Sequence, residues 1–288
     1  MTMKTGWHSV ALALLLLSGA GLAAPQAPTF STRLEAVRVD VLVTDQGRVV
    51  RGLTPADFDI RDEGVPQQVD LVSFEQIPLN VVLALDMSDS VSGERLEQLR
   101  NAGRALIDRL LHDDQAALVT FSHVVGLRTG LTQDIALLRS ALDRVRPAGE
   151  TALVDGTYAA MVLAESDVRR GLVIVFSDGV DTTSWLSPDR VLDSARRSDT
   201  VVYGVVVRGA QAPFLRDLTA RSGGGIVEIE STKDLTSRFV GILDEFRQRY
   251  LVSYSPRGVA KAGWHRLDVR VKGRKATVRA RAGYLSGS

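Results

Sequence analysis

Apolar and polar positions follow two different patterns along this chain, and the first is an alternation near the N-terminus. Valines occupy the odd positions over 37–43, which is the period of a half-buried β-strand. Turn residues at 62–64 separate two shorter expected strands, 58–61 and 67–74. The pattern predicts an antiparallel β segment over residues 33–76.

From residue 79 the alternation gives way to continuous apolar runs separated by amphipathic segments. Such runs are typical of strands buried on both faces, as in a parallel sheet covered by helices. The expected strands are 79–85, 116–121, 172–176 and 201–207. The expected helices are 96–110, 135–145, 235–246 and a segment that begins at Ser187-Pro188. Residues 79–250 therefore predict a doubly wound α/β domain, with helices on both faces of a mostly parallel sheet.

Alternation returns after Pro256, in two segments near the C-terminus. Apolar residues alternate with charged ones over 267–271 and 278–282, and a glycine turn separates the two segments as in a hairpin. A two-stranded hairpin is marginally stable in water, so its apolar face needs a partner. We therefore expect residues 251–285 to pack with the N-terminal segment. The α/β domain would then be inserted in a small antiparallel β subdomain built from both chain ends.

Composition is consistent with a well-packed, exported protein. Of the 288 residues, 45% are hydrophobic and 24% charged, enough for a full core, and the net charge of +1 argues against a nucleic-acid partner. Cysteine is absent, so no disulfide can form. Lys4 and the short apolar run 10–17 are typical of a signal peptide over residues 1–24, cleaved near Ala23 or Ala24. We expect a secreted or periplasmic product without a membrane span; a retained N-terminal anchor is the alternative.

Small oxygen-bearing side chains gather where the predicted strands end. In an open α/β sheet, ligands bind at the carboxyl ends of the strands, and oxygen ligands suit Mg²⁺ or Mn²⁺. The candidate metal ligands are Asp86, Ser88, Ser90, Thr151 and Asp178. Met87, between two of them, is expected to be a packing residue. The alternative is that Asp86 and Ser88 cap the following helix and that Asp178 caps a turn.

The segment Asp86-Met87-Ser88-Asp89-Ser90, together with Thr151 and Asp178, resembles the metal ion-dependent adhesion site of the von Willebrand factor type A domain. The resemblance covers about residues 79–250 and implies a mostly parallel sheet wrapped by helices. It also implies a non-enzymatic binding module, whose metal accepts a Glu or Asp side chain from a partner protein. The flanks, among them 52–58 and 279–284, resemble a secreted bacterial group that carries this domain.

Glu150 departs from the family pattern, which usually has a small residue before the threonine. Its carboxylate either points to solvent, which we favour, or occupies the coordination position that is open to a partner. Asp155 is predicted to be the N-cap of a helix rather than a ligand. Two other functions stay open. One is a metal-dependent hydrolase of phosphate esters, with Glu150 or Asp89 as base. The other is a structural scaffold in which the ion stabilises three loops.

Three remaining features favour structural interpretations. The histidines are scattered without a pair at metal-ligand spacing, so a zinc site is not expected. The glycine-rich segment 222–225 is interpreted as a turn between a helix and a strand, because the lysine of a phosphate-binding loop is missing. The basic tail 257–281 is interpreted as the solvated face of a hairpin.

Overall fold

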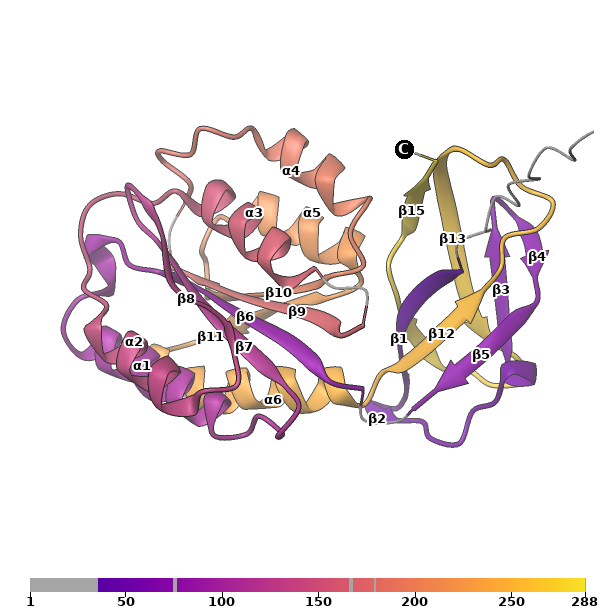
Figure 1. The fold of residues 1–288 in the computed structure, drawn as a ribbon, viewed down its shortest axis with the longest axis horizontal. Coiled ribbons are helices and arrows are strands. Elements are labelled where there is room, and N and C mark those ends of the chain that lie inside the picture. Colours follow the sequence, from indigo (N-terminus) through magenta and orange to yellow (C-terminus); the bar gives the residue numbers. More distant parts are fainter. Residues whose placement is uncertain (1–35, 75–76, 166–167, 179, 288) are drawn as a thin grey trace, which may run out of the picture. The chain divides into compact units, whose positions relative to one another are not determined.

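The computed structural model describes residues 36–74, 77–165, 168–178 and 180–287. The predicted signal peptide, residues 1–24, lies outside the described residues. The described residues belong to one compact unit, Leu34–Ser288, which contains an α/β part and a β part (Figure 1). Among the helices of the described residues, we find none with the length and apolar character needed to cross a membrane.

A six-stranded sheet forms the centre of the α/β part. From one edge to the other, its strands are β11 (Gly225–Ile229), β10 (Val201–Val207), β9 (Arg170–Ser177), β6 (Leu79–Asp86), β7 (Gln115–Phe121) and β8 (Val125–Thr132). Neighbouring strands are parallel except β7 and β8, which are antiparallel. Every residue of β6 and β9 is buried, because helices cover both faces of the sheet.

The helices form a layer on each face of this sheet (Figure 1). One layer contains α1 (Glu94–Ile107), α2 (Ile135–Arg144) and α6 (Leu235–Arg247). The other contains α3 (Leu153–Ala164), α4 (Pro188–Ala195) and α5 (Pro213–Ser222). Each helix turns its apolar stripe to the sheet, as Leu99 of α1 and Phe239 of α6 do in one core. The predicted doubly wound α/β fold is confirmed.

The β part consists of two antiparallel sheets built from both ends of the described chain. One sheet has the order β14 (Thr277–Arg279), β1 (Val37–Asp45), β12 (Tyr250–Tyr254), β5 (Val69–Ser73), with β2 (Arg48–Val49) also paired to β1. The other has the order β15 (Gly283–Ser286), β13 (Gly263–Val271), β3 (Phe58–Asp62), β4 (Val65–Gln67). Val41, Ile60 and Tyr250 are among the residues of one core to which both sheets contribute. The expected β subdomain from both chain ends is confirmed.

The two C-terminal strands do not form the hairpin that their alternation predicted. Strand β13 pairs with β3 and β15, whereas β14 pairs with β1 in the opposite sheet. The chain therefore crosses from one sheet to the other between Val271 and Thr277. Alternation fixes which side chains face the core, but it is the same for a hairpin and for two strands in facing sheets. The sequence pattern could not distinguish the two arrangements.

Two further features concern the edges of the central sheet. The edge strand β8 was not predicted, because half of its residues are exposed and it has no continuous apolar run. The glycine-rich turn between α5 and β11, at the other edge, is structural as predicted. Gly223 has a φ of +80°, and a Cβ on Gly224 would lie 1.8 Å from the carbonyl oxygen of Val202. Three short 3₁₀ turns complete the secondary structure of the described residues: η1 (Pro55–Asp57), η2 (Asp89–Val91) and η3 (Thr232–Asp234).

Arg170 joins the β part to the amino end of a central strand. It is the first residue of β9, and its Nε donates to Asp40 of β1 over 2.6 Å. Its Nη2 donates to the carbonyl oxygen of Phe246, in α6, over 3.2 Å. This junction lies at the amino end of β9, opposite to the carboxyl end, where Ser177 and Asp178 lie.

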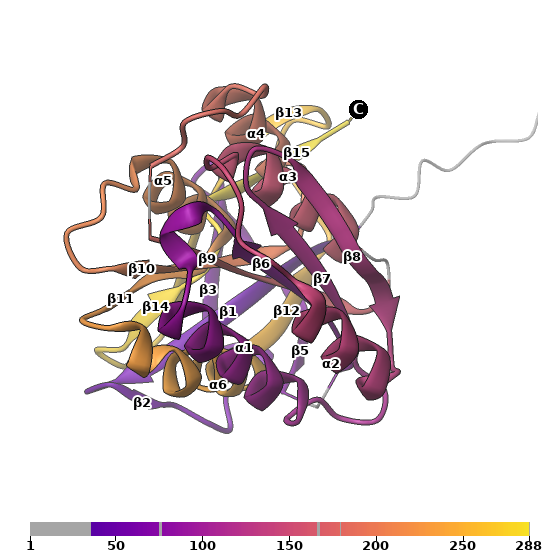
Figure 2. The ribbon, with the colours of Figure 1, turned by 90° about the vertical axis from the view of Figure 1, so that its left-hand side faces the viewer.

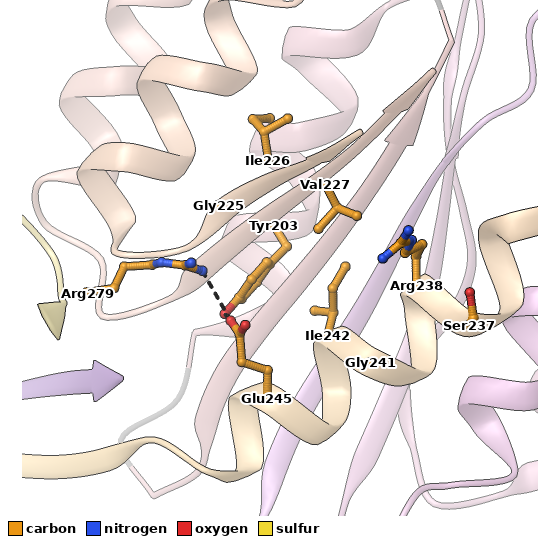
Figure 3. Close-up of a pocket in the computed structure, with 10 residues that line it drawn as sticks. All are labelled: Tyr203, Gly225, Ile226, Val227, Ser237, Arg238, Gly241, Ile242, Glu245 and Arg279. Carbon is orange, nitrogen blue, oxygen red and sulfur yellow. Dashed lines mark hydrogen bonds and ion pairs between the residues drawn. The ribbon is translucent and has the colours of Figure 1, made fainter. Parts of the chain in front are cut away.

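A pocket of about 290 Å³ lies between α6 and the neighbouring strands β10 and β11 (Figure 3). Tyr203 lies at its wall, accepts from the fully buried Arg249 over 2.6 Å and donates to Glu245. Burial raises the pKa of Tyr203 to about 12. Arg279, from β14, donates to Glu245 over 3.1 Å, so this polar network connects α6 to the β part.

Candidate metal centre

Asp86 is the last residue of β6, and its carboxylate shapes the loop that follows. It is fully buried, and Oδ1 accepts from the backbone N–H of Ser88 over 2.9 Å. Oδ2 accepts from the hydroxyl of Ser177 over 2.7 Å. The bond from Ser88 bends the chain back over the end of the strand, as in an Asx turn. Met87 is 2% exposed and packs into the core, so its predicted packing role is confirmed.

A chain of hydroxyl groups connects this loop to the end of β9. The Oγ atoms of Ser88 and Ser90 are 3.0 Å apart, and Ser90 Oγ donates to Asp178 Oδ1 over 2.8 Å. The parallel pairing of β6 with β9 places the two strand ends side by side. Asp86, Ser88, Ser90 and Asp178 are therefore brought together by hydrogen bonds at the carboxyl edge of the sheet, which faces the viewer in Figure 2.

Thr151, the remaining predicted ligand, lies on a loop that is bonded to both neighbouring loops at this edge. On one side, Asp89 and Gly149 exchange two hydrogen bonds of 3.0 Å. On the other side, the N–H of Thr151 donates to Thr182 Oγ1 over 3.1 Å, and its carbonyl oxygen accepts from the N–H of Thr182 over 2.9 Å. Thr151 is 6% exposed, and the hydrogen bonds among the described residues leave its side-chain hydroxyl unused.

The predicted N-cap role of Asp155 is wrong. Helix α3 begins at Leu153, two residues before Asp155. The first-turn N–H of α3 at Val154 is instead satisfied by Asp181, from the loop after β9, over 3.2 Å. The carboxylate of Asp155 accepts from the backbone N–H groups of Trp185 and Leu186, each over 2.9 Å, and so anchors that same loop. The sequence indicated the helix but not which acidic residue would cap it.

The charges of the site are only partly balanced. Burial raises the pKa of Asp86; hydrogen bonds from Ser88 and Ser177 oppose this shift, and the nearby charge of Asp178 adds to it. Arg95, in the first turn of α1, donates from Nη1 to Asp178 Oδ2 over 3.1 Å. Arg95 was not predicted from the sequence. The sequence feature that could have identified it is a positive charge in the first turn of a predicted helix, where the helix dipole disfavours a cation unless an acidic partner lies nearby.

The donor set suits a hard divalent cation. All predicted ligands offer oxygen. Arg95 pairs with Asp178, whereas Asp86 accepts from Ser88 and Ser177, so negative charge remains when both carboxylates are ionised. Within the described part of the chain, no cluster of three or more His, Cys, Asp or Glu could hold a metal. Oxygen donors other than carboxylates are present at this edge in the hydroxyls of Ser88 and Ser90. Glu150, next to Thr151, is exposed.

Comparison with known proteins gives a family match over the α/β part. Residues 80–241 match the family described as the von Willebrand factor type A domain. The human inter-alpha-trypsin inhibitor heavy chain H4 is 25% identical over 175 residues, which cover 55% of this chain and 19% of that protein. The matches cover about a fifth or less of the length of the curated relatives.

Two solved structures share the fold over much of the chain. A von Willebrand factor type A protein from Catenulispora acidiphila superposes with a TM-score of 0.54 at 13% identity, over 82% of this chain and 74% of that one. Proximal thread matrix protein 1 from the mussel byssus superposes with a TM-score of 0.54 at 19% identity, over 64% of this chain and 49% of that one. The MIDAS motif (metal ion-dependent adhesion site) of that structure is occupied by zinc.

Proposed function

Since this chain belongs to the von Willebrand factor type A domain family, we propose that it is a secreted, non-enzymatic module that binds a partner protein through a divalent metal ion. The observation that carries the proposal is the hydrogen-bonded chain from Asp86 through Ser88 and Ser90 to Asp178. It gathers oxygen donors from the ends of β6 and β9. The loop of Thr151 is hydrogen-bonded to the loops that follow both of these strands.

We assign the ion as Mg²⁺ or Mn²⁺. The hydroxyls of Ser88, Ser90 and Thr151 would hold it directly, and Asp86 and Asp178 would hold its bound waters. Mg²⁺ takes about six oxygen ligands and usually keeps several waters, which fits a site with few direct protein ligands. The zinc in the byssus protein's motif supports occupancy by a divalent metal without selecting among metals.

An acidic side chain of a partner protein would complete the coordination. Neutral hydroxyls compensate less of the ion's charge than direct carboxylate ligands would, so the loaded site attracts an external Glu or Asp. The exposed side chain of Glu150 is consistent with a coordination position left open to that partner.

Secretion rests on the sequence pattern of residues 1–24, which has the charged, apolar and small-residue regions of a signal peptide. A structural relative that is a thread matrix protein of the mussel byssus is consistent with this location. Mass spectrometry of the mature protein should find an N-terminus close to Ala24 or Pro25. An intact Met1 in exported material would contradict cleavage.

Titration with Mn²⁺ tests the metal site. At a free Mn²⁺ concentration of about 100 times Kd, binding contributes about 2.7 kcal/mol, which should raise the Tm by about 5–10 °C. Asp86→Ala should remove both the calorimetric signal and the rise in Tm while the circular dichroism of the fold is retained. Asp108→Ala is the control, because Asp108 is an exposed aspartate paired with Arg139. Binding by Asp86→Ala equal to that of the wild type would contradict the site.

Capture from envelope or secreted material tests the partner. We expect a protein that is retained in Mg²⁺, released by EDTA and not retained by Asp86→Ala. A partner retained under all three conditions would exclude metal-dependent binding. Turnover of a generic phosphate ester that is lost in Glu150→Ala would favour a hydrolase instead.

A further inference from the structure

Arg95 covers one of the two carboxylates of the candidate metal centre. Its Nη1 lies 3.1 Å from Asp178 Oδ2 and 3.3 Å from the carbonyl oxygen of Ser90. The Asp178 side chain is 5% exposed, whereas that of Arg95 is 55% exposed. The guanidinium therefore shields a buried carboxylate and still has solvent into which it can move.

The position of Arg95 is electrostatically unfavourable within its own helix. It lies in the first turn of α1, where free N–H groups carry partial positive charge and where Glu94 and Glu97 are the favourable residues. The negative charge that stabilises Arg95 comes from Asp178, on another loop. The second oxygen of Asp178 accepts from Ser90, so both carboxylate oxygens have partners before any metal binds.

We propose that Arg95 is a tethered cation that competes with the divalent ion for Asp178 and so weakens metal binding. The inference rests on the metal site proposed above. An ion beside Ser90 needs Asp178 for charge or to hold a water, and Arg95 already neutralises that carboxylate. A guanidinium and a divalent ion that both contact Asp178 would repel each other, so the guanidinium must swing outward when the ion enters. The site then fills only at higher divalent concentrations than an uncovered site would need.

Mn²⁺ alone is the probe that tests this competition. Arg95→Gln removes the charge, and Arg109→Gln is the matched control, because Arg109 is also 55% exposed and pairs with Asp244 over 2.8 Å. By calorimetry, we expect Arg95→Gln to bind Mn²⁺ about tenfold more tightly than the wild type. We expect the control to bind like the wild type. Metal-free Arg95→Gln should melt at a lower temperature, since Asp178 loses its counter-charge, and should show a larger rise with Mn²⁺.

The outcomes separate this inference from the metal site itself. Equal or weaker Mn²⁺ binding by Arg95→Gln overturns the inference and leaves the site in place. If neither protein binds Mn²⁺, both the inference and the site are overturned. Binding by Arg95→Gln alone supports competition. If Arg95→Gln does not fold, the Nε–H resonance of Arg95, assigned by its loss in Arg95→Lys, should shift when Mg²⁺ is added. An unchanged resonance overturns the inference.

Discussion

At Asp86, burial and ionisation oppose each other. Burial raises the pKa of this carboxyl above its ordinary 3.8, so the ionised form destabilises the metal-free fold. The folded state binds the proton more tightly than the unfolded state does. The contribution of Asp86 to stability therefore increases as the pH falls through the window just above 3.8, and decreases as the pH rises through it. A bound cation would offset this cost.

Asp86→Asn should stabilise the metal-free protein at pH 7, and the gain should shrink as the pH falls toward and below 3.8, where the wild-type carboxyl becomes protonated in both states. The amide oxygen can still accept from Ser88, and the Ser177 hydroxyl can accept from the amide group. The same variant should lose the Mn²⁺-induced rise in Tm. Urea unfolding at pH 3.5 and pH 7 in EDTA checks the first expectation, with Asp108→Asn as the exposed control. A less stable Asp86→Asn at pH 7 would contradict it.

At the scale of elements, four strands of the β part meet at one buried carboxylate. Asp62, at the end of β3, accepts from the hydroxyls of Tyr254 in β12 over 2.9 Å and Tyr284 in β15 over 2.7 Å. His265 Nδ1, in β13, lies 2.8 Å from the other carboxylate oxygen. Burial raises the pKa of both tyrosines, and the hydrogen bonds to Asp62 raise it further. Because these strands come from both ends of the chain, the network holds the two terminal segments together.

Because the pKa values of Tyr254 and Tyr284 are raised, we expect the protein to lose stability at alkaline pH. Above the ordinary tyrosine pKa of 10.0, the unfolded chain releases these protons while the folded chain retains them. The folded state then binds more protons, so the free energy of unfolding falls as the pH rises. Tyr284→Phe should weaken this decline and cost about 1–3 kcal/mol at neutral pH, because Asp62 loses a donor. Urea unfolding from pH 8 to 11.5 measures both effects.

Tyr158→Phe is the matched control, because Tyr158 is only half-buried on α3. It should leave the alkaline decline unchanged. If Tyr284→Phe and the wild type declined in parallel, Tyr284 would not be a source of the decline.

At the scale of the whole molecule, the α/β part and the β part share buried polar contacts at the edge opposite the candidate metal centre. The side chains of Arg170 and Asp40 are 5% and 9% exposed, and the Arg170 guanidinium lies 4.5 Å from the ring centroid of Phe246. Removal of one partner of a buried ion pair strongly destabilises a protein, because the other charge is left buried without a counter-charge. We therefore expect the two parts to unfold together.

Arg170→Met should destabilise the protein by about 3–5 kcal/mol, because Asp40 is left buried without a counter-charge. Arg170→Met combined with Asp40→Leu should recover most of this loss. Arg109→Met is the control, since Arg109 pairs with Asp244 at a more exposed position and its loss should cost about 1 kcal/mol or less. Urea unfolding followed by tryptophan fluorescence and by circular dichroism measures these effects. Two separate transitions in the wild type would exclude joint unfolding.

Local patterns in the sequence determined the central strands, the layer architecture and the meeting of Asp86 with Asp178. The apolar run 201–207 coincides with β10, and the run 79–85 extends by one residue in β6. Continuous apolar runs require burial on both faces, and burial requires the helices whose 3–4 spacing is also in the sequence. Once β6 and β9 pair in parallel, residues that directly follow them lie side by side.

Only the tertiary structure decided the partners that lie in other segments. In the structure, β14 pairs with β1 and not with β13. Asp155 accepts a hydrogen bond from the loop of Trp185, and Arg95 forms an ion pair with Asp178, which is 83 positions away. Periodicity is a property of a segment by itself, and it sets which side of that segment is buried. A hydrogen-bond partner in another loop depends on how the segments pack, and several packings satisfy the same periodicity.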